Sequence, residues 1–505
     1  MENILSLKRV LENYGYLKTR KIGFPYVGKK DKSEFSKNVE KVVDGFKLYD
    51  SLISTLNNNY SEEINLTSGN PMKYKPFKPS IDEMKKILNN NYLNKYPYSE
   101  GDDNVRVELL KYIESIGFNN NEPYNYDDID KYGLSKHNIT LTVSTSHAFG
   151  MILDIIARPN DVILMPSPNY GLFSFKPERI NAVVETLPID EKTYLINPEK
   201  LEEKIIEINK KLEMEYKDKL EYIPKVVAIV NSNPCNPTGK VMGEKDIKLL
   251  TDIGNICKDN GVFIIDDLVY RDLTFDNKNI AKPIGTIPGM FRNTISLFGL
   301  SKAYGLAGLR AGFVVADEII IRELINKIFQ EMDAIPSIIG VALKGAFNTT
   351  LKRNIYYKKY FNKLNNEYYF RYNILKTFIN GIESVDKKIK DKVYNYIRDN
   401  TTNKDFKIIE KGINDIDLKI EVESGFFAVL DFSKLKGKAY NGNVINTEED
   451  LLRFFYNEIK LRFIIGKSML WPNDNELVGR VTFAKERKEI INYCIKINEA
   501  IKKLV

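Results

Sequence analysis

Short apolar segments rich in β-branched residues recur between residues 64 and 316, separated by segments of helical pattern. They are residues 138–143, 161–166, 225–230, 261–266, 293–298 and 311–316. Their apolarity is nearly unbroken, which is typical of strands buried on both faces of a sheet. Strands that alternate with helices in this way predict an α/β fold with a mostly parallel sheet, whose functional side chains lie on loops at strand ends.

The chain changes character after residue 316. Long helical patterns come first, then strand-like segments, then a final helical pattern: residues 318–349, 353–380, 425–433, 462–467, 479–484 and 488–505. This order predicts a smaller α+β domain after the α/β domain.

We therefore expect an N-terminal extension at residues 1–60, a large α/β domain at 61–325 and a small α+β domain at 326–505. The extension contains short helical patterns, the first over residues 1–21. Residues 202–224 combine a helical pattern with many charges, which predicts a solvated surface insertion.

Composition excludes several classes of protein. The net charge of +7 is small for 505 residues, so we expect no nucleic-acid surface. No segment is long and apolar enough to span a bilayer, and the N-terminus lacks a secretory signal pattern. The three cysteines have no metal-ligand spacing and favour a reducing, cytoplasmic location. Two histidines cannot form a multi-histidine site, so no metal is expected.

The first chemical motif is SKAYGLAGLRAGF, at residues 301–313. Lys302 follows an apolar strand, and Arg310 comes after a glycine-rich turn. A lysine amine there can form an imine with an aldehyde cofactor, and an arginine can bind a phosphate through two N–H groups. A Ser-Lys pair alone is also compatible with a surface lysine, but the glycines and the position of Arg310 favour a cofactor site.

The second motif is IIDDLVYRDL, at residues 264–273, where two carboxylates end a buried strand. A buried aspartate needs a cationic partner or becomes protonated. A protonated pyridine nitrogen is such a partner for Asp267, and Tyr270 can donate a hydrogen bond to an oxygen of the same ring. Taken alone, the motif is also compatible with helix-capping or metal-binding carboxylates.

The third motif is NSNPCNPTG, at residues 231–239, also at a strand end. It presents a side-chain amide on a rigid loop, with Pro234 and Pro237 as candidates for cis peptide bonds. By itself it is equally compatible with a tight structural turn.

Together the three motifs stand in the order found in fold-type-I pyridoxal-phosphate enzymes, and residues 60–505 resemble the class I/II aminotransferase family. The resemblance implies a pyridoxal 5'-phosphate enzyme that moves an amino group between an L-amino acid and a 2-oxo acid by a ping-pong mechanism. It also implies a homodimer with shared active sites, because Tyr96 in YPYSEG matches a tyrosine that reaches the neighbouring subunit's phosphate group.

The resemblance assigns roles to the motif residues. Lys302 would carry the cofactor as an imine and later move the substrate proton. Asp267 would pair with the pyridine nitrogen. Tyr270 and Asn236 would hold the ring hydroxyl, and Arg310 would bind the phosphate.

Further cofactor contacts follow from the same resemblance. Tyr170, in SPNYG, would stack on the ring face. Ser144, Thr145 and Ser146, in TVSTSHAFG, match the phosphate loop at a helix N-terminus. Ser301 would assist in anchoring the phosphate.

Two positions concern the substrate. Arg480, in GRVTFA, matches the arginine that binds the α-carboxylate, and Gly69, in TSGNP, matches a glycine near that carboxylate, with Asn236 beside them. The sequence departs from the family at Gly299, where many members have a phosphate-binding serine, and at Ser144, which replaces a common glycine.

The bond that the enzyme breaks is left open by these residues. A lyase, decarboxylase or synthase of the same fold would use the same lysine, aspartate, tyrosine and arginine. A non-enzymatic regulator with an aminotransferase-like domain is a second alternative. The sequence reveals no additional basic residue for a side-chain carboxylate, so the amino acid substrate also stays open.

Overall fold

The computed structural model describes residues 33–54, 63–71, 74–88, 90–119, 133–219 and 222–505. The helical pattern expected at residues 1–21 lies outside the described residues. Within the described part of the chain, no helix combines the length and apolarity needed to cross a membrane.

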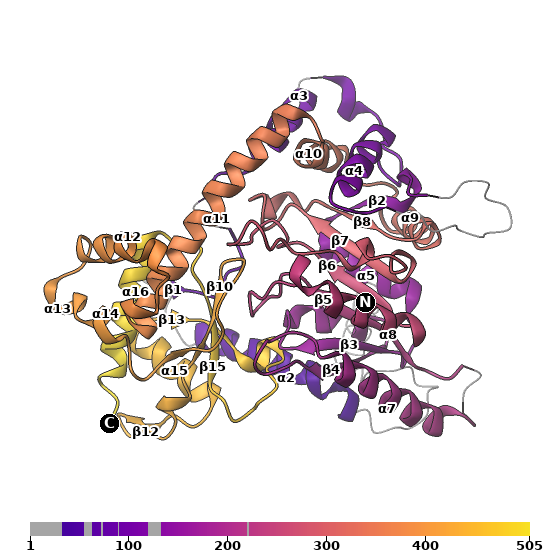
Figure 1. The fold of residues 1–505 in the computed structure, drawn as a ribbon. Helices are drawn as coiled ribbons and strands as arrows, with labels where there is room; N and C mark the ends of the chain where they lie inside the picture. Colours follow the sequence, from indigo (N-terminus) through magenta and orange to yellow (C-terminus); the bar gives the residue numbers. More distant parts are fainter. Residues whose placement is uncertain (1–32, 55–62, 72–73, 89, 120–132, 220–221) are drawn as a thin grey trace, which may run out of the picture.

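A 7-stranded sheet forms the centre of the molecule, in the order β2-β8-β7-β6-β5-β3-β4 (Figure 1). The strands are β2 (Ile139–Thr142), β3 (Val162–Ser167), β4 (Val183–Pro188), β5 (Val226–Ser232), β6 (Phe263–Asp267), β7 (Thr294–Gly299) and β8 (Gly312–Val315). Strand β8 is antiparallel to both of its neighbours, and the other adjacent pairs are parallel. The predicted α/β class is confirmed, as are the predicted strands, but β4 was not predicted.

Alternate side chains of each strand enter different apolar clusters on the two faces of this sheet. In β3, Ile163 and Met165 belong to one cluster, whereas Val162 and Leu164 belong to the other. Successive side chains of a strand point to opposite faces, so an unbroken apolar run serves both layers. The covering helices include α5 (Ser144–Ile156) and α9 (Glu318–Met332) in the first cluster, and α7 (Pro198–Tyr216) and α8 (Ile247–Asp259) in the second.

Helix α7 corrects the prediction of a solvated insertion at residues 202–224. Its buried side chains, spaced along one face, are Leu201, Ile205, Ile208, Leu212 and Tyr216. The helix begins after Asn197, whose side chain accepts a hydrogen bond from the N–H of Lys200, and Pro198 occupies the first turn. The charges occupy the outer face only, so α7 is a structural layer of the sheet.

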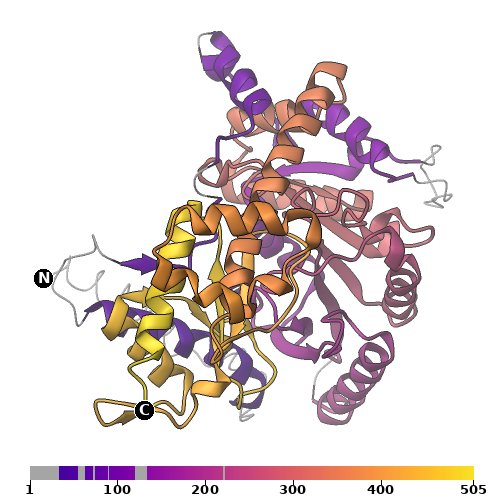
Figure 2. The same ribbon diagram turned by 60° about the vertical axis from the view of Figure 1, so that its left-hand side comes forward.

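The segment 318–349, expected as one helical pattern, forms two helices, because a non-helical turn separates α9 from α10 (Ser337–Phe347). Asp333 has a left-handed φ of 68°, and Pro336 precedes α10. Helix α11 (Leu351–Asn380) then runs diagonally to the C-terminal elements (Figures 1 and 2).

The C-terminal elements surround a 4-stranded sheet in the order β14-β15-β10-β9. Its strands are β9 (Asp417–Leu418), β10 (Phe427–Asp431), β14 (Ile464–Ile465) and β15 (Val478–Thr482). The helices of this region are α12 (Lys387–Arg398), α13 (Asn403–Phe406), α14 (Ile408–Lys411), α15 (Glu448–Ile459) and α16 (Arg487–Ile501). A short hairpin joins β11 (Ala439–Tyr440) to β12 (Asn443–Val444).

Two segments near the N-terminus contact elements that lie far from them in the sequence. Strand β1 (Ile64–Asn65) pairs in parallel with β13 (Leu461–Arg462). Helices α3 (Lys78–Leu88) and α4 (Asp103–Ser115) pack against α10. The domain boundaries stay a prediction, but the segment after residue 62 clearly contributes to both parts of the molecule.

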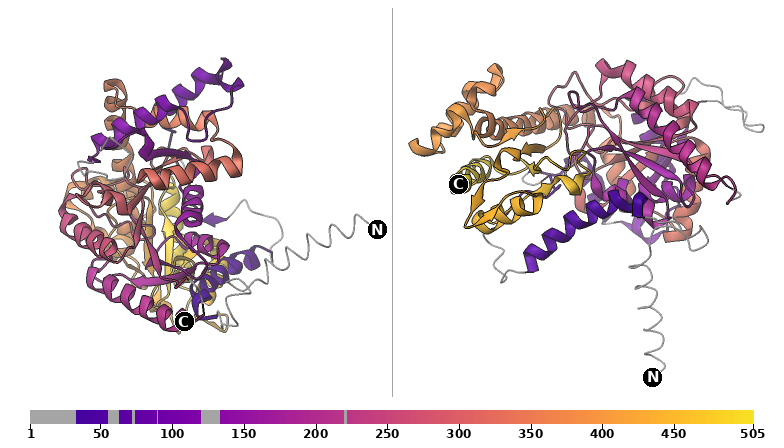
Figure 3. Two further views of the ribbon diagram at one scale, coloured as in Figure 1. Left: turned by 90° about the vertical axis from the view of Figure 1, so that its right-hand side faces the viewer. Right: turned by 90° about the horizontal axis from the view of Figure 1, so that it is seen from below.

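Helix α2 (Ser33–Ser54) crosses the underside of the molecule (Figure 3). It packs against β4, against the 3₁₀ turn η4 (Gly171–Ser174) and against the 3₁₀ turn η11 (Gly466–Met469). Val39 and Val42 are buried in these contacts. The α2 helix therefore joins the central sheet to the C-terminal elements.

Candidate active site

A cavity of about 460 Å³ lies at the carboxyl ends of β3, β5, β6 and β7 and is closed on its far side by C-terminal elements. Its lining contains all but one of the site residues predicted from the sequence: Gly69, Ser144, Thr145, Ser146, Tyr170, Asn236, Asp267, Tyr270, Ser301, Lys302, Arg310 and Arg480. The structure therefore brings together motifs that are widely separated in the chain. The roles of the individual side chains remain predictions.

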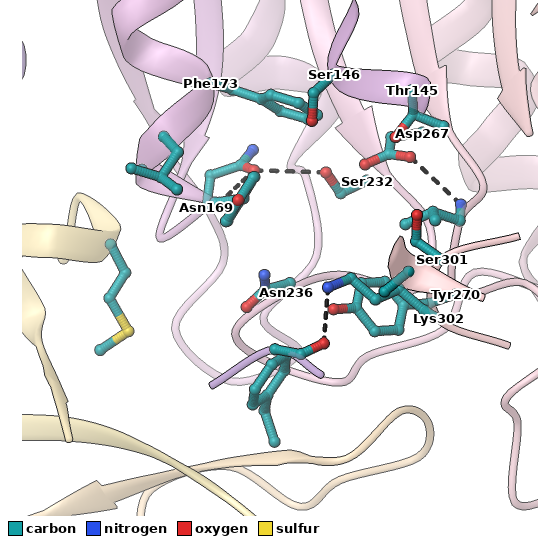
Figure 4. Close-up of a pocket in the computed structure, with 18 of the residues that line it drawn as sticks. Thr145, Ser146, Asn169, Phe173, Ser232, Asn236, Asp267, Tyr270, Ser301 and Lys302 are labelled. Carbon is teal, nitrogen blue, oxygen red and sulfur yellow. Dashed lines mark hydrogen bonds between the residues drawn. The ribbon is translucent and has the colours of Figure 1, made fainter. Parts of the chain in front are cut away.

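Lys302 lies on the loop between β7 and β8 and points into the cavity (Figure 4). Its Nζ donates a hydrogen bond to the carbonyl oxygen of Gly69 at 2.7 Å. The pKa of Lys302 is lowered from 10.5 to about 8, chiefly by burial and then by the charge of Arg480, whereas the charge of Asp267 acts in the opposite direction. Two residues on, Tyr304 donates to a carboxylate oxygen of Asp272 at 2.8 Å, which anchors the loop.

Asp267 ends β6 with its side chain 8% exposed. Its Oδ1 accepts a hydrogen bond from the N–H of Val269 at 3.3 Å. Burial raises the pKa of Asp267 to about 6, while the Val269 hydrogen bond and the charge of Lys302 lower it. Tyr270 is also buried, and burial raises the pKa of its phenol, so the hydroxyl stays a hydrogen-bond donor.

The N-terminus of α5 forms another wall of the cavity. Its first residue, Ser144, has a left-handed φ of 75°, and the preceding Val143 provides no side-chain cap. His147 donates its N–H to Oγ of Ser144 at 3.4 Å, so the N–H groups available for an anion are those of the residues before it in the first turn of α5. Arg310 also has a left-handed φ, of 56°, and is exposed, with its Nη1 donating to the carbonyl oxygen of Ala307 at 3.1 Å.

Arg480 lies on β15 and faces the cavity from the C-terminal side. Its Nη1 donates to Oδ1 of Asn236 at 2.9 Å, and its Nη2 donates to the carbonyl oxygen of Thr67 at 2.7 Å. The guanidinium carbon sits 3.9 Å from the centre of the Phe427 ring. These contacts fix the plane of the guanidinium group, as two-pronged binding of a carboxylate requires.

Three X-Pro peptide bonds at strand ends are cis. They precede Pro234 and Pro237, both anticipated from the sequence, and Pro168, which was not.

Tyr96 is the one predicted site residue outside the cavity. Its side chain is 92% exposed and borders a separate surface hollow between the η2 turn (Asn91–Asn94) and α10. It is not among the described residues that line the cavity.

Other lining residues were not predicted. Asn169 follows β3, and its buried Nδ2 lacks a hydrogen-bond partner among the described residues. Phe46 comes from α2, and Met469 comes from η11. Asn169 stands beside the predicted Tyr170, so proximity could have suggested it, whereas no motif marks the other two.

The family model described as aminotransferase class I and II matches residues 61–390. The chain belongs to this family. The aromatic-amino-acid aminotransferase 2 of Thermococcus litoralis is 28% identical over 195 residues, 38% of this chain and 44% of that relative. An aspartate aminotransferase of Pyrococcus abyssi is 28% identical over 191 residues, 37% of this chain and 43% of that relative. The chain thus matches less than half the length of these curated relatives.

Solved aminotransferases have the same fold. The structure of an aspartate aminotransferase from Rhizobium meliloti aligns with a TM-score of 0.69 at 15% identity, over 91% of this chain and 96% of that one. That of an aromatic aminotransferase from Pyrococcus horikoshii aligns with a TM-score of 0.65 at 17% identity, over 90% of this chain and 99% of that one. These alignments confirm the fold-type-I prediction.

The donor set of the cavity fits pyridoxal 5'-phosphate, the cofactor that family membership implies. An aldehyde would need an amine, which Lys302 could supply, and a cationic ring nitrogen would need a buried anion, which Asp267 could supply. The uncapped N–H groups of α5 suit a phosphate, and the unpaired Nδ2 of Asn169 is a further donor inside the same cavity.

Proposed function

We propose that the protein is a pyridoxal-phosphate-dependent aminotransferase that transfers an amino group between an L-amino acid and a 2-oxo acid. One observation carries the proposal. A lysine amine with a lowered pKa, a buried carboxylate and a fixed guanidinium line the same cavity, on Lys302, Asp267 and Arg480.

Different residues would hold the different chemical groups of the cofactor. The first turn of α5 and Arg310 would bind the phosphate, and Asp267 would pair with the ring nitrogen. Tyr270 and Asn236 would donate to the ring hydroxyl, and Tyr170 would cover the ring face. When bound, the cofactor supplies an aldehyde that captures the amino group and a ring that accepts electrons from the α carbon.

Lys302 is the group that would move the substrate proton. With a pKa of about 8, about a tenth of its amine is neutral near pH 7, far more than for an ordinary lysine, and can accept a proton. The carbonyl oxygen of Gly69, 2.7 Å away, holds Nζ inside the cavity. Proton removal and proton return would both take place at this one nitrogen atom.

Arg480 would bind the α-carboxylate of the substrate. Its guanidinium is already held by Asn236, Thr67 and Phe427, so little side-chain freedom is lost on binding. A carboxylate fixed there holds the amino end of the substrate toward Lys302. Donor and acceptor acids would share this arginine in turn, as a ping-pong mechanism requires.

The test is spectroscopic. The purified protein is mixed with pyridoxal phosphate and a panel of amino acids, and the near-ultraviolet and visible absorbance is recorded. We expect at least one amino acid to change the absorbance of the bound cofactor, and a 2-oxo acid to reverse that change. Borohydride should attach the cofactor to Lys302, and Lys302→Ala should abolish turnover with the fold intact. Release of ammonia without an acceptor acid would indicate a lyase instead.

We also propose a homodimer and a cytoplasmic location. The exposed phenol of Tyr96, which lies outside the cavity of its own chain, supports a shared site. The three cysteines are free thiols, which agrees with a reducing compartment.

A further inference from the structure

Asp272 is a buried carboxylate to which the proposed function gives no role. It is 7% exposed and is not among the described residues that line the cavity. It comes two residues after Tyr270, in the turn that follows β6. A charge at this depth is costly unless it is paired and hydrogen-bonded, so its partners indicate what it holds in place.

The carboxylate accepts hydrogen bonds from two phenols that belong to different parts of the molecule. Tyr304 lies on the lysine loop, residues 300–311 between β7 and β8, and donates to Oδ2 of Asp272 at 2.8 Å. Tyr357 of α11 donates to Oδ1 at 2.7 Å. Arg271 also donates to Oδ1, through Nη1 at 3.0 Å. Both oxygens of Asp272 therefore have strong donors, and the carboxylate joins the lysine loop to α11.

The backbone of Asp272 is fixed as well. Its carbonyl oxygen accepts a hydrogen bond from Nδ2 of Asn365 in α11 at 3.1 Å. The N–H of Leu273 donates to the carbonyl oxygen of Tyr270 at 2.9 Å, which closes the turn between the carboxylate and a residue of the cavity. The position of Asp272 is therefore set relative to both Tyr270 and α11.

Tyr304 transmits this position to the lysine loop. Its ring is enclosed by three phenylalanine rings whose centroids lie 5.0 to 5.3 Å away: Phe77, Phe347 and Phe361. Burial raises the pKa of the Tyr304 phenol well above its usual value, and the charge of Asp272 raises it further, so the hydroxyl stays a donor. Because one residue separates Tyr304 from Lys302, a shift of the tyrosine displaces the backbone that carries the amine.

We propose that Asp272 is a positioning residue, which acts through Tyr304 to hold Nζ of Lys302 where it can capture the cofactor. The proposal rests on the proposed function. In capture, the neutral amine adds to the aldehyde carbon, and the aldehyde oxygen leaves as water, so that a C=N bond replaces C=O. A displaced loop would slow this step and leave the contacts of the phosphate and the ring with other residues unchanged.

The test uses Tyr304→Phe, which keeps the enclosed ring and removes the hydroxyl alone. The 505-residue chain, freed of cofactor, is mixed with pyridoxal phosphate. Absorbance follows capture, and borohydride trapping verifies that Lys302 is the residue modified. We expect Tyr304→Phe to slow capture by about tenfold or more, since small misplacements of a reacting atom are costly.

A cofactor analogue separates positioning from binding. Pyridoxine 5'-phosphate has an alcohol in place of the aldehyde, so its affinity reports the phosphate and ring contacts without the amine. Calorimetry should give an affinity within about twofold of wild type in Tyr304→Phe, because binding is retained while the reacting group is displaced.

Tyr222→Phe is the matched control. Tyr222 donates to Oδ1 of the fully buried Asp161 at 2.8 Å, so this variant also removes a phenol from a buried aspartate. Asp161 precedes β3, at the opposite end of that strand from the cavity. Tyr222→Phe should therefore leave both the capture rate and the analogue affinity unchanged. A slowing as large as that in Tyr304→Phe would indicate general destabilisation and overturn the positioning role.

A double-mutant cycle provides a second test. Asp272→Asn keeps the shape of the side chain and removes its charge, and it should slow capture as well. Because Asp272 and Tyr304 would act as one unit, the double variant should be about as slow as the slower single variant. Effects that multiply would mean that the two residues act independently, against the proposal.

The outcomes distinguish this inference from the proposed function. Unchanged capture in Tyr304→Phe, or an equal loss of analogue affinity, would overturn the positioning role and leave the proposed function standing. Failure of the wild-type chain to capture pyridoxal phosphate on Lys302 would instead overturn the proposed function.

Discussion

Lys302 and Asp267 share a cavity that disfavours charge on both. Burial lowers the pKa of Lys302 to about 8 and raises that of Asp267 to about 6, so each group is closer to neutrality than in water. The charges of Arg480 and Arg310 act in the same direction as burial, because both lower the pKa of Lys302. An amine poised in this way is a better nucleophile at neutral pH than a surface lysine.

The first prediction concerns the pH dependence of this amine. The neutral form of Lys302 increases as pH rises through its pKa, so capture of pyridoxal phosphate by the apoprotein should accelerate up to about pH 8 and then level off. Asp267→Asn removes a charge that raises the pKa and should shift the midpoint downward. Arg480→Gln removes a charge that lowers it and should shift the midpoint upward. Stopped-flow absorbance measures these rates, and a common midpoint near 10.5 would contradict the prediction.

The second prediction concerns Gly69. A Cβ at this position would lie 2.9 Å from Nζ of Lys302, so Gly69→Ala should displace the amine from its hydrogen bond. We expect turnover to fall by about tenfold or more, since small misplacements at a reacting centre are costly. Gly308→Ala is the matched control, because it also lines the cavity but its Cβ would have nothing within 4 Å. Equal turnover in the two variants would refute the steric argument.

Among the helices and strands, those with a strong local sequence pattern were predicted, and those with a weak pattern were missed. The continuous apolar strands were recognised, whereas β4, with the sequence VVETLP, mixes buried and partly exposed positions and has no clear period. The break before α10 was missed although Pro336 disfavours a helical residue before it. Charge on the outer face of α7 concealed its buried face.

Prediction of the site shows the same limit. The site residues in motifs at strand ends were predicted correctly to share one cavity, because the carboxyl ends of parallel strands converge at one edge of the sheet. Phe46 and Met469 reach the cavity only through long-range packing of α2 and η11, and no local signal encodes that contact.

A third prediction tests the structural role of α7. Ile205 is 0% exposed and its neighbour Ile206 is 40% exposed, so the two isoleucines differ in burial and share the same helix. Ile205→Ala should lower the free energy of unfolding by about 2–5 kcal/mol, and Ile206→Ala should lower it by about 1 kcal/mol or less. Urea denaturation measures both. Similar losses in the two variants would restore the interpretation of α7 as a solvated insertion.

For the whole molecule, the decisive question is whether one chain completes an active site. The aromatic side chains of Tyr96 and Tyr98 are 92% and 73% exposed on a surface away from the cavity. A large exposed aromatic patch favours a protein interface. Under the proposed function, that interface would bring Tyr96 to the phosphate of a second copy.

The fourth prediction follows from that arrangement. Sedimentation equilibrium should give a molecular mass twice that of one chain, which is 58.3 kDa. Tyr96→Ala should raise the dissociation constant of pyridoxal phosphate by about tenfold, the worth of one hydrogen bond to a charged group. Tyr98→Ala controls for the loss of an exposed aromatic ring and should change that constant much less. A monomeric mass together with unchanged cofactor affinity in Tyr96→Ala would exclude the shared site.

The position of α2 has a consequence for biosynthesis. Helix α2 is synthesised well before its partner, because its contact with η11 needs residues 466–469. At about 5–20 residues per second, the interval is roughly 20 to 80 s. Throughout it, the side of α2 that carries Val42 has no η11 to cover it. The cavity is complete only after β15 has also been synthesised, because Arg480 is the last of its described lining residues along the sequence.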